Sequence, residues 1–423
     1  MEWNEIREEK TGLCYYQGKH QSGLTVLLFP MEGYASSYAL FGTNLGSVDQ
    51  TFKRDNEGEY TTVPHGVAHF LEHKMFEKEY GDAFTLFART GASANAYTSF
   101  DRTCYLFSAT DKLEENLGYL LDFVQEPYFT PQTVEKEQGI IGQEIKMYDD
   151  DPGWRVYFNL LGALYQKHPV RIDIAGTVES ISHITSDLLY QCYYNFYNLN
   201  NMVLSVAGNL TVPQVEQVLQ KHIKPVAPVT VERLTVEEPE EIAAPLVRQK
   251  LSVAIPLFQI GFKGRPLEGK EELRQELADE ILLEAIFGET SPFYRRLYQQ
   301  GLINQTFESE VFSGRGYYAL LFAGESRQPQ EVQKQLLEEL KQYPQGISEE
   351  AFLRCRRLMY GRQIQGFNSV ENTASAMINA AFAGVGLFDA LELLEQLTLE
   401  EVNARLPEIF RPDRCALSVI DPA

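Results

Sequence analysis

The sequence predicts an α+β protein of two duplicated modules of about 210 residues, each a largely antiparallel sheet covered by helices. The first observation is that residues 197–210, YNLNNMVLSVAGNL, resemble residues 410–423, FRPDRCALSVIDPA. In both segments a polar turn leads into a short apolar run of strand character. The second observation is that matching segments keep a nearly constant separation, which drifts only from 210 to 213 residues along the chain.

The order of elements in each module follows from the hydrophobic periodicity. We expect strands, two helices, a strand hairpin, two further helices and a final strand. FTLFARTGASANAYTSF from Phe84 matches FYRRLYQQGLINQTFES from Phe293, and both predict a helix end, a glycine and an alternating strand. Next, YLFSATDKLEENLGYLLDFV and YALLFAGESRQPQEVQKQLLEEL each predict a strand, a polar turn and an amphipathic helix. TVEKEQGIIGQEIKMY and SEEAFLRCRRLMYG extend the match.

The region between the modules differs in composition. Residues 224–246 are rich in Pro, Val and Glu and lack a helical period, so they predict an interdomain linker. The N-terminal module is then expected at residues 1–223 and the C-terminal module at residues 247–423.

Composition restricts the class of protein. The 423 residues are 44% hydrophobic and 23% charged, which is typical of a soluble globular chain of two or more domains. A formal net charge of -22 argues against a nucleic-acid or anionic-membrane partner, because both need a concentrated positive face. The five cysteines are scattered singly, and the chain shows neither a signal-like start nor an apolar run of membrane-spanning length. We therefore expect a cytoplasmic protein.

The stretch HFLEHKMFE, residues 69–77, carries the most specific chemistry. All seven histidines lie in the first module, and the corresponding segment of the second module, ELADEILLEAIF, has none. On a helix, His69 and His73 share a face and can offer two imidazoles to one metal ion. Glu72 projects close to them and is placed to deprotonate an attacking water. This order, HxxEH, is the inverzincin motif. An ordinary helix carrying core or surface histidines is the alternative, which the apolar neighbours Phe70 and Leu71 disfavour.

A catalytic zinc usually takes three protein ligands, so a third must come from elsewhere. Residues 135–152, EKEQGIIGQEIKMYDDDP, hold Glu137 and Glu144, which are seven apart and hence on one helix face. Glu144 has apolar neighbours and needs a partner, whereas Glu135 is expected to be solvated. The acidic run DDDP that follows is expected to end a helix, with cation binding as the alternative.

These segments resemble one known family. HFLEH, followed after 71 residues by the glutamate of GQEIKMYDDDP, is similar to the metal segments of the pitrilysin, insulysin and mitochondrial processing peptidase family of zinc peptidases. More narrowly, the chain resembles a bacterial branch of roughly 420 residues in which two subunits face each other as a clamshell. The resemblance implies one Zn²⁺ per chain bound by His69, His73 and Glu144, with Glu72 as the general base.

The resemblance also implies two further roles. Glu137 corresponds to a second family glutamate, which supports the ligands and orients a histidine through its free ring nitrogen. The strand GASANAYTSF is implied to be a sheet edge on which an extended peptide lies, with Asn95 and Ala96 meeting its backbone. A polar strand without that role is the alternative.

The second module departs from the family pattern. In the family an arginine and a tyrosine of this module stabilise the oxyanion. Here Tyr298 stands at the place of the arginine and Asn304 at the place of the tyrosine. Arg295 or Arg296 could substitute, although helix geometry shifts both off the expected face. The departure favours a heterodimer whose partner is a paralogue without HxxEH, and a homodimer is the alternative.

Three functions are compatible with these observations. The first is a zinc-dependent endopeptidase that hydrolyses peptides or short unfolded segments inside a dimeric chamber. The second is a non-catalytic peptide-binding or scaffold subunit, which the missing arginine and tyrosine favour and the HxxEH motif disfavours. A metallohydrolase of small molecules ranks last, because it leaves the second module unexplained. Ligand types alone do not separate zinc from manganese or cobalt.

Overall fold

Each half of the chain contributes one main sheet, and the two sheets share a topology. The computed structural model describes residues 1–55, 57–224 and 226–423. The first sheet has the strand order β1-β2-β3-β11-β4-β10-β9, and the second has the order β13-β17-β14-β16-β15. In each, the final strand of its half of the chain inserts into the middle, parallel to one neighbour and antiparallel to the other. The predicted α+β fold of two largely antiparallel modules is confirmed.

The strands of the first sheet are β1 Glu2–Arg7, β2 Cys14–Lys19, β3 Thr25–Pro30, β4 Ser37–Thr43, β9 Ser93–Thr98, β10 Thr103–Ala109 and β11 Met202–Gly208. Those of the second are β13 Leu246–Leu251, β14 Leu257–Lys263, β15 Glu308–Gly314, β16 Tyr317–Glu325 and β17 Cys415–Pro422. Short strands β5 Thr51–Arg54, β6 Thr61–Thr62 and β12 Val231–Arg233 form a third sheet, and β7 Glu77–Lys78 pairs with β8 Gly81–Asp82. β9 and β15 each form a hairpin with the neighbouring strand at one edge of their main sheet.

The helices repeat in the same order in both halves. The first half has α1 Val67–Phe76, α2 Phe84–Thr90, α3 Leu113–Gln125, α4 Pro131–Asp150, α5 Pro152–Leu164, α6 Val178–Ile181, α7 Ser186–Phe196 and α8 Val212–His222. The second has α9 Gly269–Phe287, α10 Pro292–Gln299, α11 Pro329–Leu340, α12 Glu349–Gly366, α13 Val370–Ala383, α14 Asp389–Gln396 and α15 Leu399–Ile409. Five helices, rather than the two predicted, separate each hairpin from the final strand.

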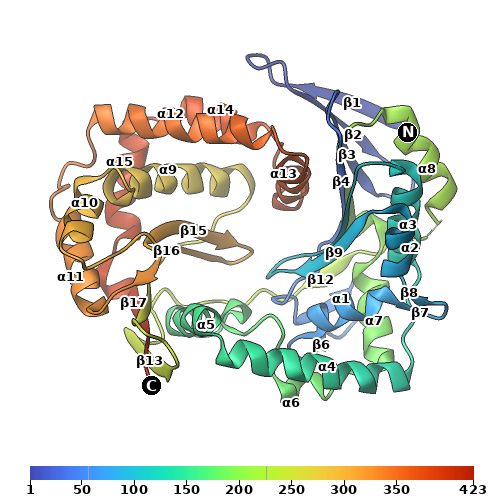
Figure 1. The fold of residues 1–423 in the computed structure, drawn as a ribbon, viewed down its shortest axis with the longest axis horizontal. Coiled ribbons are helices and arrows are strands. Elements are labelled where there is room, and N and C mark those ends of the chain that lie inside the picture. The colour runs from blue at the N-terminus through green and yellow to red at the C-terminus, as the bar shows by residue number, and fades with distance from the viewer. Residues whose placement is uncertain (56, 225) are drawn as a thin grey trace. The chain divides into compact units, whose positions relative to one another are not determined.

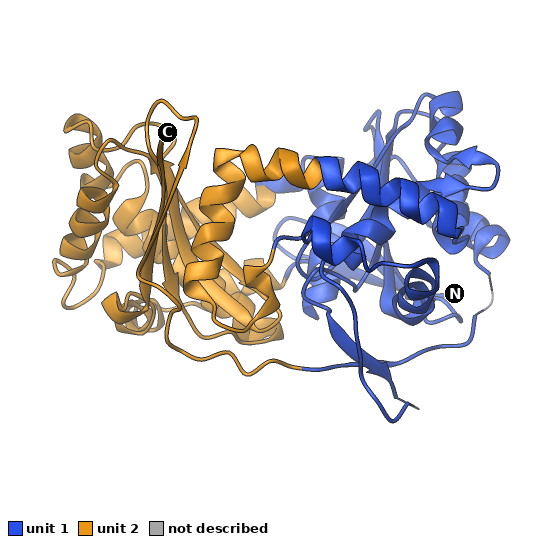
Figure 2. Ribbon diagram, turned by 90° about the horizontal axis from the view of Figure 1, so that it is seen from below, with its two compact units in different colours: residues 1–143, 173–234, 365–388 blue, residues 144–172, 235–364, 389–423 orange. Residues whose placement is uncertain are grey.

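The compact units exchange segments of chain (Figure 2). Unit 1 comprises residues 1–143, 173–234 and 365–388, and unit 2 comprises the remainder. As a result α13, from the second half, packs on β11 and β4 of unit 1, where the Ser205 hydroxyl donates to the Ala374 carbonyl at 2.7 Å. Within unit 1, α3 and α8 cover the opposite face of the sheet (Figure 1). In unit 2, α5 from the first half packs on β17 and β14.

A glycine permits the close approach of the exchanged helix in each sheet. A Cβ on Gly42 of β4 would lie 2.8 Å from Ile378 Cδ1 of α13. A Cβ on Gly261 of β14 would lie 2.7 Å from Leu164 Cδ1 of α5. Both distances are shorter than a van der Waals contact, so each glycine gives space that the helix fills.

Described parts of the predicted linker bond to neighbouring segments within each compact unit. Residue 225 lies outside the described residues. Within unit 1, Val231–Arg233 pairs with β5. Within unit 2, Glu238 accepts hydrogen bonds from the Lys263 ammonium at 2.6 Å and from the backbone of residues 166–168. The boundaries at residues 223 and 247 stay a prediction about the duplication, since the compact units follow a different division.

Two further features bear on the sequence-based expectations. All five cysteines are free thiols, of which Cys14 is half-buried and the others are buried. Among the helices in the described ranges, none combines the length and apolar character that crossing a bilayer requires.

Candidate active site

Helix α1 positions the HxxEH residues by burying its other face. Its apolar residues Phe70, Leu71 and Met75 are fully buried in unit 1. The helix starts after Gly66, whose φ of 88° is in the left-handed region that glycine adopts without a steric penalty. A Cβ there would lie 2.4 Å from the Ala175 carbonyl oxygen, so this turn needs glycine on two grounds.

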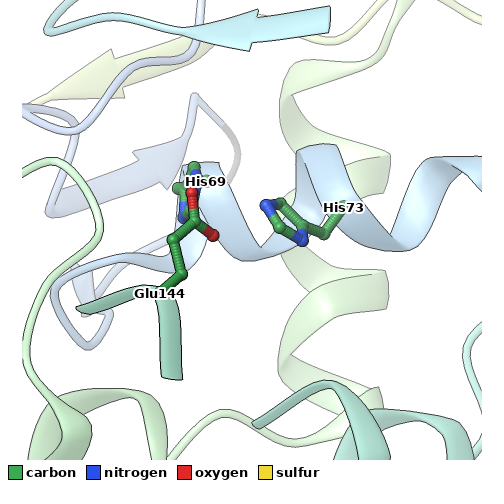
Figure 3. Close-up of side chains that lie close together, drawn as sticks. All are labelled: His69, His73 and Glu144. Carbon is green, nitrogen blue, oxygen red and sulfur yellow. The ribbon is translucent and has the colours of Figure 1, made fainter. Parts of the chain in front are cut away.

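Three predicted ligand residues come together (Figure 3). The ligand atoms of His69, His73 and Glu144 all lie within 4.8 Å of one another. The two imidazole rings, from α1, have centroids 4.6 Å apart, and the carboxylate comes from α4. The boundary between the compact units falls inside α4, but this helix is continuous from Pro131 to Asp150.

The cluster fits a zinc ion. Zinc binds histidine nitrogen and carboxylate oxygen at about 2.0–2.2 Å, so ligand atoms in a tetrahedral site stand about 3.4 Å apart. The three ligand atoms lie within 4.8 Å of one another, so they would move closer together on binding the ion. Two histidines and one glutamate are also a donor set found in catalytic zinc sites, where the fourth position stays open. His69 is 8% exposed, and the other two ligand residues are half-buried.

Glu137 holds one of the two histidines. Its Oε1 lies 3.1 Å from His73 Nδ1, and the glutamate is buried. When Nδ1 donates to this carboxylate, Nε2 carries the lone pair that a metal can accept. The structure thus places Glu137 where the sequence analysis expected an orienting residue, two helical turns before Glu144 on the same helix.

The predicted general base is held by a residue that the sequence analysis missed. The Thr98 hydroxyl donates to Glu72 Oε2 at 2.9 Å. Thr98 is the last residue of β9, so this bond joins the edge strand to α1. A threonine on an alternating strand gives no sequence signal of such a contact, because Thr is common in strands for other reasons.

A second missed contact involves the third ligand residue. The Tyr148 hydroxyl donates to Glu144 Oε1 at 2.7 Å. Tyr148 follows Glu144 by four residues on α4, a spacing that places two side chains side by side. That spacing was the available signal.

Asn95 and Ala96 lie in β9 beside the predicted base. Among the described strands of this sheet β9 pairs with β10 alone, so its outer edge is open to a further strand. The Asn95 side chain accepts a hydrogen bond from the Ala96 backbone N–H at 2.9 Å. Both residues line a cavity of about 570 Å³ together with Glu72, His73 and the stacked rings of Phe76 and Phe84, among others. Their contact with a substrate stays a prediction.

The second module places Tyr298 and Asn304 as follows. Tyr298 is 46% exposed and stacks on Tyr294. The Asn304 amide donates to Glu325 at 2.8 Å, while its oxygen accepts from the Thr306 backbone N–H. Of the two candidate substitutes, Arg296 is paired with the buried Glu339 at 2.7 Å, and Arg295 is exposed.

The acidic run after α4 ends that helix, as expected. Asp150 is its last residue, and Asp151 caps the next helix by accepting from the Trp154 backbone N–H at 2.6 Å. Pro152 occupies the first turn of α5, where a missing N–H costs nothing.

Comparison with known proteins gives one consistent result. The family model described as insulinase (peptidase family M16) matches residues 59–178, and the model described as the peptidase M16 inactive domain matches residues 183–359. The uncharacterized zinc protease YmfH of Bacillus subtilis (strain 168) is 42% identical over 429 residues, covering 100% of this chain and 99% of that protein.

Two solved structures extend the comparison. An M16-like protein from Alicyclobacillus acidocaldarius has a TM-score of 0.93 at 36% identity, covering 100% of this chain and 99% of that chain. Pitrilysin has a TM-score of 0.76 at 16% identity, covering 99% of this chain and 46% of that chain, a likeness that shows the fold alone.

Proposed function

The chain belongs to the insulinase family, peptidase family M16, and on this premise we propose that it is a zinc-dependent endopeptidase acting on peptides or short unfolded segments. The resemblance stated from the sequence is thereby confirmed at the level of the family. The observation that carries the proposal is the cluster of His69, His73 and Glu144 beside the carboxylate of Glu72.

The chain's own side chains divide the chemistry among them. A zinc ion held by the three ligand residues supplies a Lewis acid for the scissile carbonyl and the attacking water. Glu72 accepts a proton from that water and transfers it to the leaving amine. Thr98 fixes one oxygen of the Glu72 carboxylate, and Glu137 fixes the ring of His73. These two hydrogen bonds therefore restrict the movement of the Glu72 carboxylate and of the His73 ring during proton transfer.

The open edge of β9 supports an extended peptide as the substrate. A peptide that pairs with this edge adds one strand to the sheet through backbone hydrogen bonds, as in other β-augmentation complexes. Asn95 and Ala96 lie on that edge and line the same cavity as Glu72 and His73. This arrangement favours a peptide backbone over a small molecule.

For the assembly, we propose a dimeric clamshell, with this chain as the HxxEH-bearing subunit of a heterodimer. The support is that Asn304 and Arg296 are engaged by Glu325 and Glu339, which favours an oxyanion group supplied by a partner subunit. A homodimer is the second possibility. For the location we propose the cytoplasm, which the five free thiols favour.

A non-catalytic peptide-binding or scaffold subunit is the second candidate function. Tyr298 and Asn304 favour it, since a subunit that performs no chemistry has no need of an oxyanion group. A scaffold would have no reason to keep His69, His73 and Glu144 within reach of one ion.

The deciding experiment is cleavage of a quenched fluorogenic peptide library by the zinc-loaded chain, alone and mixed with a paralogue that lacks HxxEH. We expect cleavage in the mixture that disappears with Glu72→Gln. Equal cleavage by the chain alone would contradict the heterodimer, and no cleavage in either sample would favour the scaffold.

A further inference from the structure

The residues where α4 ends and α5 begins contact Glu144 of the candidate metal site, although the proposed chemistry does not use them. The Tyr148 hydroxyl donates to Glu144 Oε1 at 2.7 Å. A phenol hydrogen bond to an ionised carboxylate is charge-assisted and therefore among the stronger hydrogen bonds.

Tyr148 is in turn held by an aromatic stack. The rings of Tyr148 and Trp154 lie 4.5 Å apart at an interplanar angle of 15°. The indole also contacts Phe158, a buried residue of α5, at 5.1 Å between centroids. A stacked phenol has fewer rotamers available, so its hydroxyl is directed toward a defined place.

The acidic run, residues 149–151, helps to position Trp154 for its stack with Tyr148. Asp151 accepts from the Trp154 backbone N–H, and Pro152 sets the first turn of α5, so the start of this helix is defined at both positions. Arg155 lies 3.5 Å from Asp149 across the same joint. The motif YDDDPGW, residues 148–154, thus connects the start of α5 to Glu144, the third ligand residue. The contacts run from Asp151 to Trp154, from Trp154 to Tyr148, and from Tyr148 to Glu144.

We propose that Tyr148, supported by Trp154 and the Asp151 cap, is a positioning residue that holds Glu144 ready for the metal. This inference rests on the proposed function. A glutamate has three rotatable bonds, and a ligand fixed before the metal arrives loses less conformational freedom on binding. Hydrogen-bond partners of metal ligands typically change metal affinity by about 10–100-fold when they are removed.

The test is the zinc affinity of Tyr148→Phe, measured by competition with a chromophoric chelator on the full-length chain. This variant keeps the stacked ring and removes only the hydroxyl. We expect zinc binding about 10–100-fold weaker than in the unchanged chain. Tyr194→Phe makes the same chemical change at an exposed tyrosine of α7 and should bind zinc as the unchanged chain does.

A second variant separates positioning from folding. Trp154→Leu removes the stack but leaves the hydroxyl, so it should weaken zinc binding by less than Tyr148→Phe does. The midpoint of thermal unfolding of metal-free Tyr148→Phe should match that of the metal-free unchanged chain, and in peptide cleavage kcat should fall more than KM rises.

The outcomes distinguish the two proposals. If the unchanged chain binds zinc and Tyr148→Phe binds it equally well, the positioning role is wrong while the proposed function stands. An unfolding midpoint that falls in step with the affinity would likewise overturn the role in favour of a purely structural one. If the unchanged chain binds no zinc, both proposals fail together.

Discussion

Helices α1 and α9 occupy corresponding places at the edge strands of the two sheets. Each accepts a hydrogen bond from a hydroxyl of its own edge strand. In the first module the Thr98 hydroxyl of β9 donates to Glu72 of α1. In the second, the Ser313 hydroxyl of β15 donates to Glu276 of α9. Each module thus has a hydroxyl–carboxylate bond between its edge strand and the adjoining helix, but the two bonds do not occupy matching positions of the repeat, since the carboxylates are 204 residues apart and the hydroxyls 215.

The two helices differ in how their buried polar groups are satisfied. In the first module His69, His73 and Glu144 converge as a possible metal site. In the second, the fully buried Asp279 forms a two-pronged ion pair with Arg405 and accepts from the Tyr318 hydroxyl at 2.7 Å. Buried charges need partners, and Asp279 of the second module finds them in Arg405 and Tyr318, whereas in the first module three ligand atoms lie close enough together that they could hold an ion.

The comparison is tested most strongly by removing one hydrogen-bonded carboxylate from each helix. Glu72→Gln should lower kcat by at least about 10²–10⁴-fold, because the amide of glutamine cannot accept the proton that the Glu72 carboxylate is proposed to accept. Glu276→Gln should leave peptide cleavage unchanged, since Glu276 accepts a hydrogen bond from Ser313 and is not among the residues proposed to carry the chemistry. Both rates are measured on the same fluorogenic peptide, and zinc content is measured to show that Glu72→Gln still binds metal.

Equal losses in the two variants would show that the second module takes part in the chemistry. The division of roles drawn from α1 and α9 would then be wrong.

Removing the metal should have the next largest effect, and this effect should depend on the first module alone. Zinc that binds only the folded chain stabilises it by about 3–4 kcal/mol at a concentration 100–1,000 times its dissociation constant. A chelator should therefore lower the midpoint of thermal unfolding of the unchanged chain. His69→Ala should begin at the lower midpoint and show no response to the chelator, whereas Arg405→Ala should remain responsive although it is less stable. A chelator response in His69→Ala would place the metal elsewhere.

Much of this arrangement could be predicted from the sequence, because the decisive signals are local. His69, Glu72 and His73 lie on one helical turn, and Glu137 and Glu144 lie on another helix at a spacing of two turns. The hairpins and final strands were found because the same polar turn and apolar run occur twice. In each case the periodicity of one element determined which side chains share a face.

The exchange of α5 and α13 could not be predicted in this way. An apolar helix face shows that a helix is covered, but it does not show which sheet covers it. The small side chains at the crossings, Gly42 and Gly261, acquire meaning only when the helix above them is known. The hydroxyls of Thr98 and Tyr148 were missed for a related reason, since a lone polar residue has many common roles.

A pH-dependent difference should follow from the acidic residues of α9. Burial, reinforced by the nearby Glu276, raises the pKa of Glu280 to about 7 from an ordinary value of 4.5. Between these two values the unfolded chain has lost the proton while the folded chain keeps it, so the free energy of unfolding falls as pH rises. Above about pH 7 the full penalty is present.

Glu280→Gln removes this penalty. Relative to the unchanged chain, its gain in free energy of unfolding should be larger at pH 8 than at pH 5.5 by roughly 2 kcal/mol, measured by urea denaturation. A gain that is equal at the two pH values would mean that Glu280 titrates as an exposed carboxyl does.

The smallest expected effect concerns the hydrogen bond from the edge strand to the helix carboxylate. Thr98→Val keeps the shape of the side chain and removes the hydrogen bond to Glu72, so kcat should fall by about 3–10-fold, in keeping with one hydrogen bond of about 1 kcal/mol. Thr98→Ser should restore most of the rate, because serine retains the donor. Ser313→Ala removes the bond to Glu276 and should leave kcat unchanged.

These three rates determine what such a bond does. If the fold alone required it, Thr98→Val and Ser313→Ala would lower stability alike, and neither would change kcat at temperatures where both proteins are folded. A loss of kcat confined to Thr98→Val would instead show that the bond from the edge strand holds the base in place where the histidines are. The two modules would then use the same kind of bond between edge strand and helix at different positions, and only the bond beside the histidines would serve the chemistry.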